Sequence, residues 1–191
     1  VFGPWDRSVF GKEKPIKIGH PDAMSGPYTT LGTYGTWGAM VAVNRINKAG
    51  GINGRPVEMI VEDTQGQVPM ALRKVRKLIE KDEVHVLQGI TSSKVCLGIM
   101  PTCREFKTAF MVGISMATDI TREQADRYTF RPMNNATIQA LAMGPWLVKN
   151  IGKKWSFAYV DYAWGQSEYK EFSESIKKLS LIHISEPTRP Y

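Results

Sequence analysis

The sequence predicts an α/β fold in which helices flank a parallel sheet. Three observations carry this prediction. Short apolar segments with strand character recur along the chain, longer amphipathic segments stand between them, and Gly- or Pro-containing turns separate the two kinds. This alternation is typical of βαβ units, which build parallel sheets through right-handed crossovers.

The first three strand–helix pairs have clear local signals. Ile16-Lys-Ile18 with its flanks opens the first strand, and Met24-Ser-Gly-Pro27 is a turn. Apolar residues at helical spacing then predict a helix, which Gly50 and Gly51 end by supplying positive φ. Ser92 and Ser93 are suitable N-cap residues for the third helix. This part of the chain is expected to hold strands at 16–18, 57–61 and 84–87 and helices at 33–48, 69–80 and 92–106.

The second part of the sequence repeats the pattern. An apolar strand is expected at 109–112 and a short one at 128–130, followed by a helix over 137–150 that Gly152 closes. A strand over 155–160 and a helix over 166–178 complete the series. Residues 1–14 are expected to form an irregular leader.

The last thirteen residues, 179–191, continue neither the strand nor the helix period. They resemble a translated sequencing-adapter read-through, and we treat the segment as a non-native tail outside the fold. We therefore expect the natural protein to run on past Lys178. The alternative is an irregular natural tail.

Composition and charge favour a soluble globular protein. Hydrophobic residues make up 42% of the chain and charged residues 23%. No apolar run approaches the roughly 18 residues of a membrane-spanning helix. The net charge of +7 comes largely from basic residues on helix faces. Such faces are usually solvated, and no helix-turn-helix, zinc-finger or RNP signature accompanies them, so no nucleic-acid partner is expected.

The two cysteines, Cys96 and Cys103, are seven positions apart on a predicted helix. They share a face but are separated by about 10 Å of helical rise, which is too far for a disulfide between them. We expect two buried free thiols and no metal site.

Polar loops at strand ends are the candidate binding region, because ligands of parallel sheets bind outside the carboxyl ends of the strands. The expected loops are 20–32, 89–93, 113–121 and 161–165. Ser92 and Ser93 begin a helix, where hydroxyls and unpaired N–H groups can receive a carboxylate or phosphate. Plain N-capping explains them equally well. Ser115 and Thr118 either extend the same anion site or belong to a surface turn.

Two aromatic residues, Tyr162 and Trp164, follow the last expected strand beside Gly165. They suggest a lid over an apolar or zwitterionic ligand, the alternative being ordinary packing beneath the next helix. His20 and His85 are far apart, and the sequence contains no G-x-S-x-G, HExxH or CxxC motif. We therefore expect binding without catalysis, and no cofactor or metal.

Several segments resemble one known family. They are Ile16-Lys-Ile-Gly-His-Pro-Asp-Ala-Met-Ser-Gly-Pro27, residues 42–57 with their Asn-Lys-Ala-Gly-Gly-Ile-Asn-Gly stretch, residues 62–64, Thr91-Ser-Ser93, Tyr128-Thr-Phe-Arg-Pro132 and Tyr159-Val-Asp-Tyr-Ala-Trp-Gly165. Together they are similar to the start of the branched-chain amino-acid (Leu/Ile/Val) binding proteins of ABC importers, over about residues 15–178. These proteins have the type I periplasmic binding fold.

The resemblance implies two α/β lobes that close on a ligand. Residues 15–121 would form an incomplete N-terminal lobe and 122–178 the start of the second lobe. By position, the ligand carboxylate falls on Ser92, with Ser93 near, and on Ser115 and Thr118, and Trp164 with Tyr162 covers the ligand. The chain departs from the family at Leu31, where an aromatic residue is usual, and at Gln65 and Thr91, where some members have a disulfide. Members are about twice as long as this chain.

The resemblance also implies a function. We expect a monomeric solute-binding component that binds a small amino acid or a related carboxylate or amide and delivers it to an ABC permease in the membrane. Its location would be periplasmic or extracellular. A lipid anchor is neither predicted nor excluded, because the chain begins at Val1 and no signal peptide is visible in it. The alternatives are an extracellular sensory domain of a receptor and, disfavoured by the missing G-x-G-x-x-G spacing, a nucleotide-using enzyme.

Overall fold

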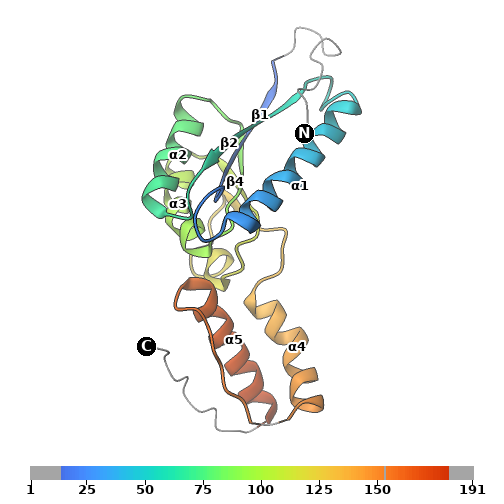
Figure 1. Cartoon of the computed structure of the whole chain (residues 1–191), viewed down its shortest axis with the longest axis vertical. Helices are drawn as coiled ribbons and strands as arrows, with labels where there is room; N and C mark the ends of the chain where they lie inside the picture. The colour runs from blue at the N-terminus through green and yellow to red at the C-terminus, as the bar shows by residue number, and fades with distance from the viewer. Residues whose placement is uncertain (1–13, 153, 181–191) are drawn as a thin grey trace.

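A five-stranded parallel sheet forms the body of the protein. The computed structural model describes residues 14–152 and 154–180 (Figure 1). The strands are hydrogen-bonded in the order β2-β1-β3-β4-β5, and every neighbouring pair is parallel. Their bounds are β1 Ile16–Asp22, β2 Val57–Asp63, β3 Val86–Gly89, β4 Ala109–Val112 and β5 Thr129–Phe130. The predicted α/β class with a parallel sheet is confirmed.

Helices cover both faces of this sheet. Helix α1 lies on one face and helices α2 and α3 on the other (Figure 1). The main core fills the space beneath α2 and α3, where Leu78, Leu87 and Phe110 are fully buried. The helical elements are α1 Thr29–Lys48, α2 Val68–Glu80, α3 Ser93–Glu105, the 3-10 helix η2 Thr118–Thr121, α4 Ala136–Asn150 and α5 Ala163–Ser180.

The first loop is shorter than the expected span 20–32. Strand β1 runs on to Asp22, and α1 already begins at Thr29. Gly32 permits this early start, because a Cβ there would overlap the backbone carbonyl of Ala23. Gly50 and Gly51 end the helix with φ values of 95° and 76°, as predicted.

The predicted strand over 155–160 is wrong. Residues 154–160 are not paired with any strand in the described part of the chain. A strand needs a hydrogen-bonded neighbour, and here side chains pack on a helix instead. The ring of Tyr169 in α5 contacts Phe157 and Tyr159 at centroid distances of 5.6 and 4.9 Å. The segment is therefore held by α5 rather than by a sheet.

Helices α4 and α5 pack side by side, away from the sheet (Figure 1). Helix α5 continues through Leu179 and Ser180, two residues into the segment treated as a tail. The rest of that segment, 181–191, and leader residues 1–13 lie outside the described residues. The lobe boundary after residue 121 stays a prediction; the sheet itself extends past it, because β5 pairs with β4.

The cysteines lie as expected. Cys96 and Cys103 are both free and buried in α3. Burial raises the pKa of each thiol to about 12, which keeps both protonated and unreactive at neutral pH.

Candidate ligand-binding site

A pocket of about 80 Å³ lies at the carboxyl ends of the strands. Hydroxyls from the β3–α3 connection face it, together with apolar residues that follow β4 and aromatic residues from the α1 and α5 entries. Its lining residues are Tyr28, Leu31, Thr91, Ser93, Ile114, Met116, Tyr162 and Trp164. Segments distant in sequence thus meet at the place where parallel sheets bind ligands.

The β3–α3 turn has an unusual backbone. Gly89 has φ 135°, and the β-branched Ile90 has φ 69°, in the left-handed region. Such a conformation costs an isoleucine on the order of 1–3 kcal/mol and persists only when its surroundings fix it. The Ile90 N–H donates to the Pro21 carbonyl at 3.1 Å, and the Ile90 carbonyl accepts from Ser115 Oγ at 2.9 Å. The turn is therefore fixed by β1 and by the loop that follows β4.

Two hydroxyls follow this turn and face the pocket. Ser93 Oγ accepts from the backbone N–H groups of Met116 and Ala117, both at 3.2 Å. Both of its lone pairs are then occupied, and only its hydrogen is left for a ligand. Thr91 Oγ1 is buried and has no hydrogen-bond partner in the described structure.

The pocket includes only part of the predicted set. Ser93, Tyr162 and Trp164 line it, whereas Ser92, Ser115 and Thr118 do not. Ser92 is the N-cap of α3 by position, but its side chain makes no capping hydrogen bond.

The hydroxyls of Ser115 and Thr118 are engaged inside the protein. Ser115 Oγ donates to the carbonyl of Ile90, and Thr118 Oγ1 is hydrogen-bonded to Thr137 Oγ1 at 3.1 Å. The Thr118 N–H donates to Ser167 Oγ at 3.2 Å, which ties η2 to α5. A ligand-binding role for all six predicted residues stays a prediction.

Sequence reasoning did not select five of the eight lining residues, among them Thr91 and Tyr28. Thr91 stands in the same hydroxyl cluster as Ser92 and Ser93. The sequence therefore indicated the cluster, but not which of its three hydroxyls lines the pocket. Tyr28 follows Pro27 at the end of the first turn. It is an aromatic residue that stands three positions before Leu31, the position at which the family usually has one.

The aromatic side of the pocket links the start of α1 to the start of α5. The rings of Tyr28 and Tyr162 meet edge to face at 6.2 Å, and Tyr162 lies 6.2 Å from Trp164. Burial and the hydrogen bond with Tyr28 raise the pKa of Tyr162 to about 12. The Tyr162 phenol is therefore neutral at physiological pH.

The turn beside the pocket depends on Asp63 at the end of β2. Its Oδ1 accepts from the N–H groups of Met24, Ser25 and Gln65, and its Oδ2 accepts from Ser25 Oγ at 2.6 Å. Burial raises the pKa of Asp63, but these hydrogen bonds outweigh it, so the pKa lies below its ordinary value of 3.8.

This depressed pKa predicts an acid-sensitive turn. The carboxylate contributes stability that is fully present above pH 3.8 and is lost as the pH falls through the lower folded-state pKa. Asp63→Asn keeps an oxygen acceptor but does not titrate. As the pH falls below about 4, the free energy of unfolding of this variant should therefore decrease less than that of the unsubstituted protein. Urea denaturation at several pH values measures this; parallel pH profiles of the two proteins would contradict it.

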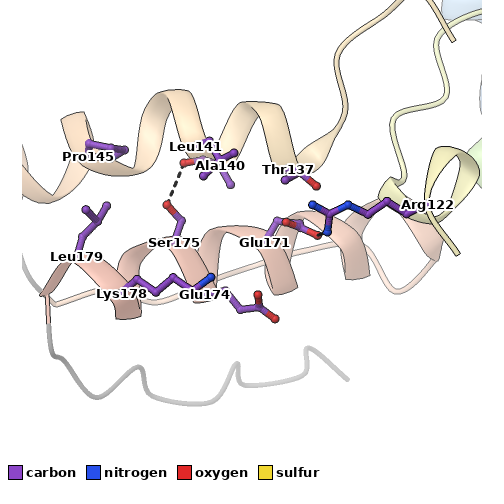
Figure 2. Close-up of a pocket in the computed structure, with 10 residues that line it drawn as sticks. All are labelled: Arg122, Thr137, Ala140, Leu141, Pro145, Glu171, Glu174, Ser175, Lys178 and Leu179. Atoms are coloured by element: carbon purple, nitrogen blue, oxygen red, sulfur yellow. Dashed lines mark hydrogen bonds and ion pairs between the residues drawn. The ribbon is translucent and has the colours of Figure 1, made fainter.

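A larger pocket of about 330 Å³ lies between α4 and α5 (Figure 2). Ser175 Oγ donates to the Ala140 carbonyl at 3.1 Å, and Arg122 forms an ion pair with Glu171 at 3.6 Å. Both contacts can be followed in Figure 2. This pocket contains none of the six predicted site residues and lies away from the strand ends. Arg122 and Glu171 are paired with one another, and the pocket is not at the strand ends where parallel sheets bind ligands, so its larger volume does not make it the better ligand site.

Neither a metal-binding cluster nor a membrane-spanning helix is found among the residues that the structure describes. In this part of the chain, no group of three or more His, Cys, Asp or Glu side chains is placed to hold a metal ion. None of the described helices combines the length and apolar character needed to cross a membrane.

Comparison with known proteins identifies the family. The family model described as periplasmic binding protein matches residues 15–185. The Leu/Ile/Val-binding protein homolog 4 of Brucella abortus is 26% identical over 161 residues, which are 80% of this chain and 38% of that protein.

Solved structures agree with this match. A periplasmic binding protein from Burkholderia mallei gives a TM-score of 0.78 at 28% identity, covering 86% of this chain and 44% of that one. A solute binding protein of an ABC transporter from Rhodopseudomonas palustris, in complex with 3,4-dihydroxy benzoic acid, gives a TM-score of 0.80 at 24% identity. This match covers 91% of this chain and 46% of that one. This second likeness concerns the fold alone.

The chain spans less than half the length of these three relatives. The family match nevertheless extends over nearly all of the chain, and the parallel sheet with its strand-end pocket agrees with it. The chain belongs to the periplasmic binding protein family.

Proposed function

We propose that the protein is the solute-binding component of an ABC importer. It would bind a small amino acid or a related carboxylate or amide in the strand-end pocket and deliver it to a membrane permease, without a catalytic step. It would act as a monomer in the periplasm or outside the cell. The named relatives support this, since one is a Leu/Ile/Val-binding protein homolog and another is a solute binding protein solved with a dihydroxybenzoic acid.

The observation that carries the proposal is the division of the pocket into two chemically different sides. Thr91 and Ser93 offer hydroxyl hydrogens beside the start of α3, where unpaired N–H groups and the helix dipole favour an anion. Tyr28, Tyr162 and Trp164 offer ring surfaces for an apolar body. A small carboxylate with an apolar or aromatic side group fits this division.

Lobe closure would follow from binding. The ligand would contact the β3–α3 turn and the α5 entry at once, so it would bind a closed arrangement more tightly than an open one. Such a difference in affinity is what a solute-binding protein needs in order to signal occupancy to a permease. The lobes expected at 15–121 and 122–178 are the two bodies that would close.

Isothermal titration calorimetry tests the proposal. The titrants are L-leucine, L-isoleucine, L-valine and 3,4-dihydroxybenzoic acid. Their matched controls, which lack the carboxylate, are isoamylamine, 2-methylbutylamine, isobutylamine and catechol, in the same order. The expected result is saturable binding of at least one acid and none of its decarboxylated control. No binding of any acid, or equal binding of acid and control, would contradict the proposal.

A further inference from the structure

Arg131 follows directly after β5 and holds the segment that connects β4 to the end of η2, residues 115–121. Its Nη1 donates to the Ala117 carbonyl at 2.6 Å and, at 3.5 Å, to the Ser115 carbonyl. Its Nη2 donates to the Thr121 hydroxyl. All three acceptors belong to this one segment, which we call the 115–121 loop. A single side chain therefore bridges the start and the end of the loop.

The contact uses a charged group where no charged partner is present. Arg131 is partly buried, and burial lowers the pKa of its guanidinium. None of the ion pairs that join described residues involves Arg131. Its donors are instead directed to neutral oxygens of the loop, and the planar fork of the guanidinium reaches several of them at once. A side chain with fewer donors could not replace this set of contacts.

Helix α3 holds the same loop through its first residue. Ser93 Oγ accepts from the N–H groups of Met116 and Ala117, both at 3.2 Å. The peptide group between Ser115 and Met116 thus has its carbonyl on Arg131 and its N–H on Ser93. Hydrogen bonds linked in this way polarise and strengthen one another. The backbone of Met116 is therefore fixed between the end of β5 and the start of α3.

Fixing this backbone places two parts of the pocket wall. The side chain of Met116 lines the pocket, and its Sδ accepts from Gln139 Nε2 of α4 at 2.9 Å. Ser115 Oγ donates to the carbonyl of Ile90, whose left-handed backbone shapes the β3–α3 turn. Arg131 itself is not among the lining residues. Any effect of Arg131 on ligand binding must therefore act through the 115–121 loop.

We propose that Arg131 is a positioning residue of the ligand pocket, which acts through the 115–121 loop by fixing Met116 and the Ser115 support of the β3–α3 turn. This inference rests on the proposed function and adds to it a residue outside the pocket on which affinity depends. The loop is arranged before a ligand arrives, and such preorganisation raises affinity because less has to be ordered on binding. Loss of the guanidinium should weaken binding although it removes no contact with the ligand.

The test compares Arg131→Leu with Arg131→Lys in the protein with every residue that its gene encodes. Leucine removes all the donors, whereas lysine keeps the charge but not the fork. Two quantities are measured: the affinity for the acid identified by calorimetry, and the NMR signal of the Met116 methyl group in the ligand-free protein. The methionine methyl groups are isotope-labelled, and Met116→Leu identifies the Met116 signal by its loss.

We expect Arg131→Leu to weaken binding about tenfold and to shift or broaden the Met116 signal. Arg131→Lys should weaken binding about threefold and move the signal less. Arg127→Leu is the matched control, because it removes the same charge from an exposed residue whose guanidinium lies over the Tyr128 ring at 5.8 Å. It should leave affinity within about twofold and the Met116 signal in place.

A merely structural Arg131 would lower Tm without changing either quantity. If Arg131→Leu folds and leaves both the affinity and the Met116 signal unchanged, the inference fails while the proposed function stands. If Arg131→Leu does not fold, Arg131→Lys decides by the same two measurements, and no change in either of them overturns the inference. If the unsubstituted protein binds no acid, both the proposed function and the inference fail.

Discussion

Replacing Trp164 with alanine is expected to weaken ligand binding by about 2 kcal/mol or more, roughly 30-fold. Trp164 lines the pocket next to Tyr162, and its indole Nε1 donates to Glu168 Oε1 at 3.0 Å, which fixes the ring on α5. A fixed aromatic ring gives a ligand a large apolar contact at little cost in side-chain entropy. Calorimetric titration of the variant measures the loss.

Trp146→Ala is the matched control for this variant. Trp146 stands on α4, outside the strand-end pocket, and is 57% exposed. It should leave the dissociation constant unchanged, and Trp164→Phe should restore most of the affinity. If Trp146→Ala and Trp164→Ala lose the same amount of ligand affinity, Trp164 at the start of α5 does not contact the ligand.

Ser93→Ala should lower the free energy of unfolding by about 2–4 kcal/mol. The serine is 2% exposed, and its Oγ accepts from the N–H groups of Met116 and Ala117. Alanine leaves both N–H groups without this acceptor. Denaturation in urea, with ligand absent, measures the change.

Ser92→Ala provides the comparison at the preceding position. Ser92 is buried to a similar degree, but its side chain makes no capping hydrogen bond, so its loss should cost under about 1 kcal/mol. A similar loss of stability in both variants would mean that Ser93 does not hold the β4 loop against α3.

The fold was largely predictable because its signals are local. Gly50 and Gly51 end α1 through their own backbone freedom, and the apolar runs of β3 and β4 place Leu87, Phe110 and Val112 in the core. The strand expected over 155–160 does not form, and the reason is non-local. Its apolar residues suit a strand, but a strand exists only with a hydrogen-bonded neighbour, and Tyr169 of α5 packs against them instead.

The location of the site could be predicted from the sequence better than the individual residues that line it. Parallel topology places the loops after β1, β3 and β4 at one edge, so Ser93 could be selected from sequence. Tyr162 and Trp164 also line the pocket, although the strand expected before them does not form. Which hydroxyl faces the pocket depends on the left-handed backbone of Ile90 and on the hydrogen bond from Ser115 Oγ to its carbonyl. Neither can be read from a cluster of hydroxyl residues, and for this reason Thr91 was not selected.

The most direct test of the account is the position of a bound acid in a crystal structure of the protein. The account predicts that the carboxylate lies at the start of α3, within hydrogen-bond distance of Thr91 Oγ1, with the ligand body against Tyr162 and Trp164. An acid bound between α4 and α5, in the pocket that Arg122 and Glu171 line, would contradict it.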